Sequence, residues 1–451
     1  MLLHQNYPTG LFMIKAFKID KGNDSLHNIG GIFLIGQALE HSNLNEIFQS
    51  TRRSGLQFQD VDILKSQIGI LSQAREKFTD ISQFRGNQVF IKSLKLKGVP
   101  SEERLRQRLD EMPQSHHSLL EQANTQLLKT RKLGTINISG MTFTPVDMDV
   151  SPLDNTNSNK ESVGRTYKGD DGFAPMFAYI GTEGFMLANE LRPGTQHAQK
   201  GMPEFLDKTS SMLKELKLKH PVLIRLDAAH DAEINFDHLP KEHYFIIKRN
   251  LRKECPEQWL ALAKRTGRQI ESRDGKNVYI GEVHHKSPGN NEKRSVVPIS
   301  YKVTERLTDH DGNQLLIPEY EVSTYWTNLP LEAQDIITLY QDHGTSEQFH
   351  SELKSDMNIE RLPSGKFKTN QIYLHCAMLA FNLLRIIGQL LIDNKHLAPV
   401  KIKGKRRRLR TVIRDLILLA CKHVKHSGNE ILKFGRYSPW FEVYKRISLS
   451  I

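Results

Sequence analysis

The sequence predicts an α/β protein in which helices precede a mixed β-sheet, an antiparallel β insertion interrupts it, and helices follow. Apolar residues recur at helical spacing up to about residue 135, and strand-like alternation begins near Gly134. Strand-like runs then flank a helical segment at 203–218, as expected for a sheet covered by helices. Turn-rich β segments fill about 265–325, and the remainder reads as helical.

These changes of pattern divide the chain into predicted regions. They are a helical region at 1–135, a core formed by 136–264 and 326–395, the β insertion at 265–325, and a basic, helical region at 396–451. Within the core, 222–226 and 244–248 are predicted strands, and 173–191 is predicted to form two strands joined by a turn at 181–184. Turns at 287–291 and 309–313 are expected to separate strands of the insertion.

The net charge predicts a nucleic-acid partner. The chain has 63 Lys and Arg against 51 Asp and Glu, a formal charge of +12. A positive surface attracts a polyanion and gains free energy by releasing its condensed counterions. The basic run Lys401–Arg410 is predicted to be either a solvated loop or a phosphate contact.

Cysteine usage and hydropathy favour a soluble protein in a reducing compartment. Three scattered cysteines, without zinc-type spacing, indicate neither a disulfide framework nor a structural zinc. Residues 1–15 lack a signal-peptide pattern, and the apolar run Ala377–Ile392 is interrupted by polar residues, which argues against a membrane span. We therefore expect a cytoplasmic, nucleoid-associated location and no membrane partner.

Carboxylates stand in or directly after two predicted strands. Asp147 and Asp149 are two residues apart, so both point to the same face of a strand. Asp227 directly follows the apolar run 222–226. A carboxylate there is costly unless it is paired, hydrogen-bonded or bound to a cation. A cap or turn role is the ordinary alternative for each aspartate alone.

A later segment places ionisable side chains on one helix face. Tyr340, His343, Glu347 and Lys354 are separated by steps of three, four and seven, which return to nearly the same direction. A solvated stripe is the alternative. Three carboxylates from distant positions match the oxygen ligands that Mg²⁺ takes. Two such ions ~3.5–4 Å apart suit phosphodiester chemistry.

The same spacing resembles a signature of bacterial insertion-sequence DDE transposases, Tyr-x2-Arg-x3-Glu-x6-Lys. In this chain His343 occupies the arginine position. Further segments between about 140 and 395 are similar to one branch of that family: 147–156, 165–169, 191–195, 224–228 and 361–367.

The resemblance implies a ribonuclease H-like core and a metal site. In such a core the first aspartate lies on the first strand, the second on the fourth, and the glutamate on a later helix, after a β insertion. The resemblance assigns Asp149, Asp227 and Glu347 as catalytic ligands of two Mg²⁺ ions, with Mn²⁺ as a substitute. Asp149 is chosen because Asp-Val-Ser fits the family's Asp-x-Ser/Thr pattern, and Asp147 is the alternative.

The resemblance also implies a DNA transposase. Such an enzyme cleaves double-stranded DNA at transposon ends and joins the 3′ hydroxyls to target DNA, with a homodimer holding two ends and residues 1–135 binding them. The residues expected to contact DNA are Tyr340, His343, Lys354, Arg165, Lys168 and Trp326. Trp326 is expected either to stack on a base or to be a core aromatic. The alternative functions are a nuclease that cuts without joining and a DNA-binding protein descended from a transposase.

Overall fold

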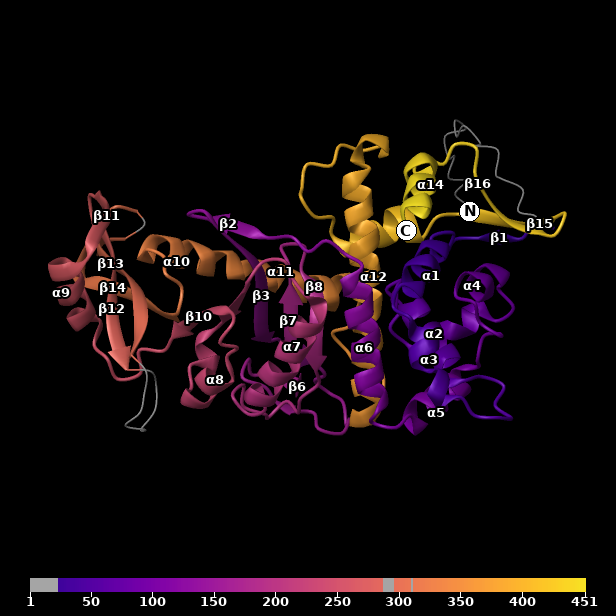
Figure 1. The fold of residues 1–451 in the computed structure, drawn as a ribbon, viewed down its shortest axis with the longest axis horizontal. Helices are drawn as coiled ribbons and strands as arrows, with labels where there is room; N and C mark the ends of the chain where they lie inside the picture. The colour runs from indigo at the N-terminus through magenta and orange to yellow at the C-terminus, as the bar shows by residue number, and fades with distance from the viewer. Residues whose placement is uncertain (1–22, 287–295, 310) are drawn as a thin grey trace, which may run out of the picture.

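The centre of the protein is a mixed β-sheet (Figure 1). The computed structural model describes residues 23–286, 296–309 and 311–451. The core strands are β3 (Met141–Val150), β7 (Met176–Ile180), β8 (Phe185–Glu190), β9 (Val222–Leu226) and β10 (Tyr244–Arg249), in the spatial order β8-β7-β3-β9-β10. β3 is antiparallel to β7 and parallel to β9, which is parallel to β10. Asp149 lies on the first of these strands and Asp227 directly after the fourth, as the resemblance implies.

The β insertion continues the same sheet instead of forming a separate one. Its elements are α9 (Pro256–Thr266), β11 (Arg268–Arg273), β12 (Lys276–Lys286), β13 (Val296–Thr308) and β14 (Gln314–Thr327). The C-terminal half of β14 lies between β13 and β10, so that Trp326 is opposite both Ile299 and Ile247. In Figure 1 this insertion forms one end of the elongated molecule. The turn predicted at 287–291 lies outside the described residues.

A tight turn starts the first core strand. β2 (Ile136–Ile138) pairs antiparallel with β3 through a two-residue turn at Ser139 and Gly140. Both turn residues have positive φ, 47° and 82°, as hairpin turns that follow the right-handed strand twist require. The strand-like alternation that begins near Gly134 therefore corresponds to two strands, β2 and the long strand β3, joined by this turn.

Smaller elements surround the core sheet, and three of the short strands form a separate sheet in the order β4-β6-β5. They are β4 (Leu153–Asp154), β5 (Gly164–Arg165), β6 (Asp171–Phe173), α7 (Met202–Leu216), η3 (Ala228–His230) and α8 (Glu233–His238). After the insertion come α10 (Ala333–Gln341), η4 (Asp342–Gly344), α11 (Thr345–Ser351), the π-helical turn η5 (Glu352–Asp356) and α12 (Phe367–Asp393). The helix expected at 203–218 corresponds to α7, which begins after Gly201, a residue with φ of 79°.

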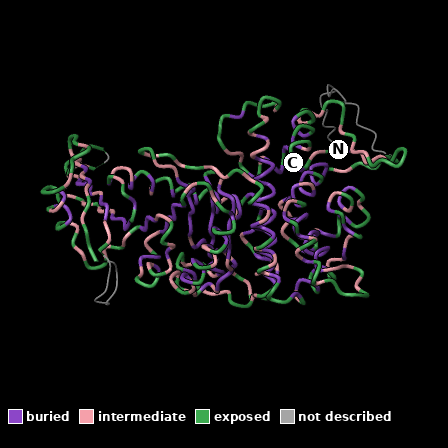
Figure 2. The backbone as a smooth tube through the Cα atoms, viewed as in Figure 1, coloured by how far each residue is buried: buried purple, intermediate pink, exposed green. Residues whose placement is uncertain are grey.

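From residue 23 on, the described part of the N-terminal region is mostly helical and packs on α12, and residues 1–22 of the predicted helical region lie outside the described residues. Its elements are α1 (Ile32–Glu40), α2 (Leu44–Ile47), η1 (Gln49–Thr51), α3 (Asp60–Leu71), η2 (Phe78–Phe84), α4 (Gln88–Ser93), α5 (Glu102–Glu111) and α6 (His116–Lys129). By length and composition α12 is able to cross a membrane, but 83% of its most apolar window is buried among α3, α6 and β8. Figure 2 shows this buried zone running through the middle of the molecule. α12 is therefore the helix around which both halves of the core pack.

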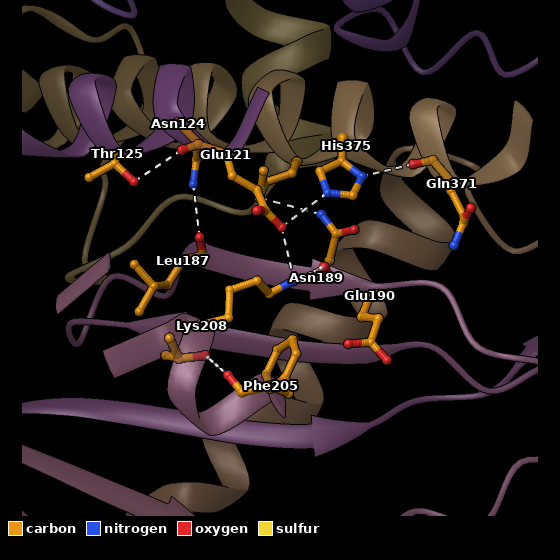
Figure 3. Close-up of polar contacts among 12 residues, drawn as sticks. Glu121, Asn124, Thr125, Leu187, Asn189, Glu190, Phe205, Lys208, Gln371 and His375 are labelled. Carbon is orange, nitrogen blue, oxygen red and sulfur yellow. Dashed lines mark hydrogen bonds and ion pairs between the residues drawn. The ribbon is translucent and has the colours of Figure 1, made fainter. Parts of the chain in front are cut away.

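A buried polar network fastens α6 and α12 to the sheet (Figure 3). Glu121 accepts hydrogen bonds from Lys208 Nζ at 2.9 Å and from His375 Nε2 at 3.3 Å. Burial alone would raise the pKa of Glu121, but the hydrogen bond from His375 and the charge of Lys208 outweigh it and lower the pKa to about 2. Asn124 donates to Leu187 O on β8 at 3.0 Å. These satisfied groups set the position of the helices over the sheet.

The C-terminal region corrects the prediction of helices alone for 396–451. It contains η6 (Lys395–Leu397), α13 (Leu409–Val412), the π-helical turn η7 (Ile413–Ile417), the strands β15 (Cys421–His426) and β16 (Asn429–Phe434), and α14 (Phe441–Ser450). β15 also pairs with β1 (Leu26–His27), so the N-terminal and C-terminal regions form one lobe (Figure 1). β15 and β16 pair with each other as a hairpin, and β1, 394 or more residues away in the sequence, adds a third strand that local sequence pattern does not report.

Candidate metal centre

Two aspartates meet where parallel strands end. β3 and β9 run side by side with Asp147 opposite Arg225 and Met148 opposite Leu226. One residue further along each strand are Asp149 and Asp227. Because the strands are parallel, both carboxylates reach the same edge of the sheet. Residues 78 positions apart in the sequence (227 minus 149) therefore lie close together.

A histidine completes this group. After β9 the chain makes the 3₁₀ turn η3, in which Asp227 Oδ1 accepts a hydrogen bond from the backbone N–H of Ala229 at 3.1 Å. The turn brings His230 back over the strand end, with Nε2 3.5 Å from Asp227 Oδ1. Ligand atoms of Asp149, Asp227 and His230 all lie within 4.8 Å of one another. Reasoning from the sequence did not identify His230, although its position three residues after Asp227 was a usable signal.

The electrostatics of this group fit a divalent cation. Burial and then the negative charge of Asp149 raise the pKa of Asp227 to about 6. Burial lowers the pKa of His230 to about 4, so this imidazole is neutral at pH 7 and has a lone pair to offer. A cation between the carboxylates would remove their repulsion. The donor set of two carboxylates and one imidazole is one that divalent metal ions accept in proteins.

Asp147 has a different role, which corrects its assignment as the alternative metal ligand. It is 4% exposed, and both of its carboxylate oxygens bind the guanidinium of Arg225, at 2.6 and 2.8 Å. His343 Nδ1 adds a third contact at 2.8 Å. Burial opposes ionisation, but Arg225 and His343 outweigh it and lower the pKa of Asp147. Its lone pairs are therefore used within the protein.

The same contacts correct the expected role of His343. The side chain was predicted to face DNA, but it is only 8% exposed and points at Asp147. Its ring lies 5.4 Å from that of Tyr340, which is half-buried. Burial and then the charge of Asp227 raise the pKa of Tyr340. The Tyr340 ring also lies 4.7 Å from that of Tyr325, so it packs between two rings.

The helix that carries Glu347 packs beside the aspartates. On α11, His350 Nε2 lies 3.6 Å from Asp149 Oδ2, and Tyr179 shares a hydrogen bond with His350 Nδ1 at 3.3 Å. Glu347 lies one turn earlier on the same helix and is exposed. Positions three apart are neighbours on a helix surface, so Glu347 borders the site. Its carboxylate is outside the group formed by Asp149, Asp227 and His230.

Cationic side chains surround the carboxylates. Lys354, on η5, is half-buried and donates to Pro152 O at 2.5 Å. Burial, together with the positive charge of Lys168, lowers the pKa of Lys354 despite the nearby carboxylates of Glu360 and Asp149. Arg165 is exposed and contacts Asp171 at 3.8 Å. The charges of Asp149 and Lys168 both act on Lys354, and Arg165 lies on the short strand β5.

Tyr167 is a site residue that the sequence analysis missed. Its hydroxyl donates to Val150 O at 3.1 Å, one residue after Asp149. Burial and then the charges of Asp149 and Asp227 raise the pKa of Tyr167 to about 12. Most of the ring is still exposed, which leaves it open to a partner. The sequence feature that could have identified Tyr167 is its position between Arg165 and Lys168, which are both predicted DNA contacts.

Trp326 does not face solvent as a DNA contact requires, whereas most Lys and Arg residues of the basic run are exposed. Trp326 is 2% exposed, and its indole N–H donates to Asp231 Oδ1 at 3.0 Å, so the ring is a core aromatic. In the basic run Lys401–Arg410, arginines pair with carboxylates of the two π-helical turns. Arg406 Nη1, for example, is 2.7 Å from Glu352 Oε1. These arginines form ion pairs within the protein, which is neither the solvated loop nor the phosphate contact predicted for the run.

The fold and the site define a mixed α/β protein with paired aspartates at the edge of its central sheet. The sequence matches the family described as Transposase DDE domain group 1 over residues 24–451, and the chain belongs to this family. No curated protein matches it significantly. Among solved structures it is similar to the piggyBac transposase in a synaptic complex with hairpin DNA, with a TM-score of 0.41 and 9% identity over 86% of this chain and 79% of that chain.

Proposed function

We propose that this protein is an active transposase of the bacterial insertion-sequence kind. It would cleave double-stranded DNA at transposon ends and transfer the 3′ hydroxyls into target DNA. The observation that carries the proposal is the convergence of Asp149 and Asp227, from two parallel strands, with His230 into a group within 4.8 Å. Membership of the DDE transposase domain family over nearly the whole chain supports it.

Each residue of this site has a distinct proposed role. When bound, two Mg²⁺ or Mn²⁺ ions supply an activated oxygen nucleophile and stabilise the leaving oxygen. Asp149 and Asp227 hold the ions, and Glu347 completes the acidic set from α11. His350 orients Asp149 through its contact at 3.6 Å. The Asp147–Arg225 pair fixes β3 against β9 and so fixes the spacing of the two catalytic aspartates.

DNA is held by the cations around the carboxylates. Lys354, Lys168 and Arg165 offer contacts to phosphates next to the scissile bond. Tyr167 offers an exposed aromatic face beside them. The net charge of +12 supplies the longer-range attraction. A homodimer would bring two transposon ends together, with residues 1–135 binding the end sequences.

Cleavage and joining assays test this proposal. Labelled duplexes carrying the element's terminal repeats, with MgCl₂ and a supercoiled target, report cleavage and strand transfer separately. We expect Asp227→Asn to reduce both cleavage and strand transfer by at least about 10³-fold, because it removes a group central to transition-state stabilisation. The variant should still bind DNA. Asp274→Asn, on the exposed turn between β11 and β12, is the matched control. Cleavage without joining by the wild-type protein would favour the nuclease alternative, and full activity of Asp227→Asn would refute the site.

A further inference from the structure

His230 is a buried polar side chain with unused hydrogen-bonding capacity. It is 0% exposed, and neither ring nitrogen has a hydrogen-bond partner. Burying such a group without a partner costs about 1–3 kcal/mol, and natural proteins rarely leave one unexplained. Other buried histidines here do have partners: His343 bonds Asp147, and His116 bonds Asp60 at 2.9 Å.

The surroundings of His230 indicate what its nitrogen faces. Asp227 Oδ1 is 3.5 Å from Nε2 but is already bonded to the N–H of Ala229. Ligand atoms of both aspartates lie within 4.8 Å of the imidazole. Arg192, His343 and His197 also act on it electrostatically, but none of them forms a hydrogen bond with it. The gap between the three side chains is thus lined by donors of electron pairs.

We propose that His230 is the third protein ligand of a divalent ion held by Asp149 and Asp227, and that it selects a transition-metal ion such as Mn²⁺ over Mg²⁺. The inference rests on the proposed function and goes beyond the acidic ligand set that the resemblance implies. Imidazole nitrogen suits transition metals, whereas Mg²⁺ prefers oxygen ligands. His350 Nε2 also has no hydrogen-bond partner, but its Nδ1 is engaged by Tyr179 and it is outside the group formed by Asp149, Asp227 and His230.

Pulsed electron paramagnetic resonance of Mn²⁺ bound to the full-length protein tests the ligand directly. Coordinated histidine produces ¹⁴N modulation of the Mn²⁺ echo, and labelling histidine with ¹⁵N changes its frequencies. We expect this signal in the wild-type protein without DNA, its loss in His230→Gln and its retention in His350→Gln. Absence of nitrogen coupling in the wild-type protein would overturn the proposal without depending on how any variant folds.

Metal titrations give the selectivity. We expect His230→Gln to weaken Mn²⁺ binding by at least about tenfold, since even outer residues of metal sites are worth 10–100-fold, and to change Mg²⁺ binding much less. His220→Gln is the matched control, because His220 precedes β9 at the end opposite Asp227. A folded His230→Gln variant with unchanged Mn²⁺ affinity refutes the inference. If Asp227→Asn also binds Mn²⁺ like the wild type, the proposed function fails as well, so the two failures are distinguishable.

Discussion

Asp147 and Asp149 point to the same face of β3, but the neighbouring strand gives them different partners. Arg225 lies opposite Asp147 on β9, and Asp227 follows one residue beyond the end of β9, next to Asp149. Asp147 is therefore neutralised within the protein, whereas Asp149 meets a second negative charge. The choice between the two as metal ligand depends on which side chain each faces across the sheet.

Replacing Asp147 is expected to damage the fold. Asp147→Asn leaves the guanidinium of Arg225, 2% exposed, without its counter-ion. Breaking one partner of a buried pair costs about 3–5 kcal/mol. We expect a loss of that order in the free energy of unfolding by urea, and little change for the exposed control Asp274→Asn. A stable but inactive Asp147→Asn protein would instead give Asp147 a role in catalysis.

Asp227 is expected to make the metal-free protein pH-sensitive. Its pKa of about 6 in the folded protein is above the ordinary value of 3.8. The folded state binds this proton more tightly than the unfolded state does. Proton binding to Asp227 therefore makes its full contribution to the free energy of unfolding below about pH 4, and this contribution is lost as the pH rises to about 6. With a chelator present, Asp227→Asn should be more stable than the wild type at pH 7, and the difference should shrink toward pH 4. Thermal unfolding at several pH values measures this, and a pH-independent difference would contradict the assignment.

At the scale of elements, the basic run braces the helix that carries Glu347. Asp356, on η5, is fully buried and accepts from Arg408 Nε at 2.8 Å and from the backbone N–H of Arg410 at 3.1 Å. The guanidinium of Arg406 lies 4.5 Å above the ring of Phe349 on α11. The segment after α12 is thus tied to both α11 and η5. The π-helical turn presents Asp356 to this segment, and such turns often occur at functional sites.

Asp356→Asn is expected to loosen this brace. Loss of the charged hydrogen bonds costs about 2 kcal/mol, which corresponds to roughly 30-fold faster amide exchange where opening is local. Hydrogen exchange should therefore accelerate in residues 406–412 and in α11. Asp393→Asn, on the exposed end of α12, serves as the comparison. Unchanged exchange in α11 would mean that the basic run does not support the site.

At the scale of the whole molecule, the last helix completes the N-terminal lobe. α14 packs against α1 and α12, and the hydroxyl of Tyr444 donates to Gly30 O at 2.8 Å. Ile447 is 0% exposed, whereas Leu449 on the same helix is 73% exposed. A helix at the very end of the chain therefore contributes to the core of a region that begins it.

The buried face of α14 gives a matched pair of variants. Ile447→Ala should destabilise the protein by about 2–4 kcal/mol, because it removes buried methyl groups and leaves a cavity. Leu449→Ala should have an effect within about 0.5 kcal/mol. Limited proteolysis of Ile447→Ala should cut first in the N-terminal helices. Equal effects of the two variants would mean that α14 does not dock as described.

Local sequence patterns were sufficient to predict the type and position of many secondary-structure elements. Alternation and continuous apolar runs predicted β3, β7, β8, β9 and β10, because strand formation follows side-chain period and β-propensity. Serine is a favoured N-cap residue, and the hydroxyl of Ser101 caps α5 by accepting from the N–H of Arg104 at 3.2 Å. Asp227 was singled out because a carboxylate directly after a buried strand requires a partner. Spacing alone placed Glu347 on a helix.

Tertiary structure decided which side chains meet. Register between β3 and β9 paired Asp147 with Arg225 and left Asp149 free to meet Asp227 and His230. The position of α10 and α11 turned His343 inward, and the sheet extension buried Trp326. β1 is a strand only because it pairs with β15, a segment far away in the sequence. Local periodicity reports which face a residue occupies, but the partner on that face comes from segments far away in the chain.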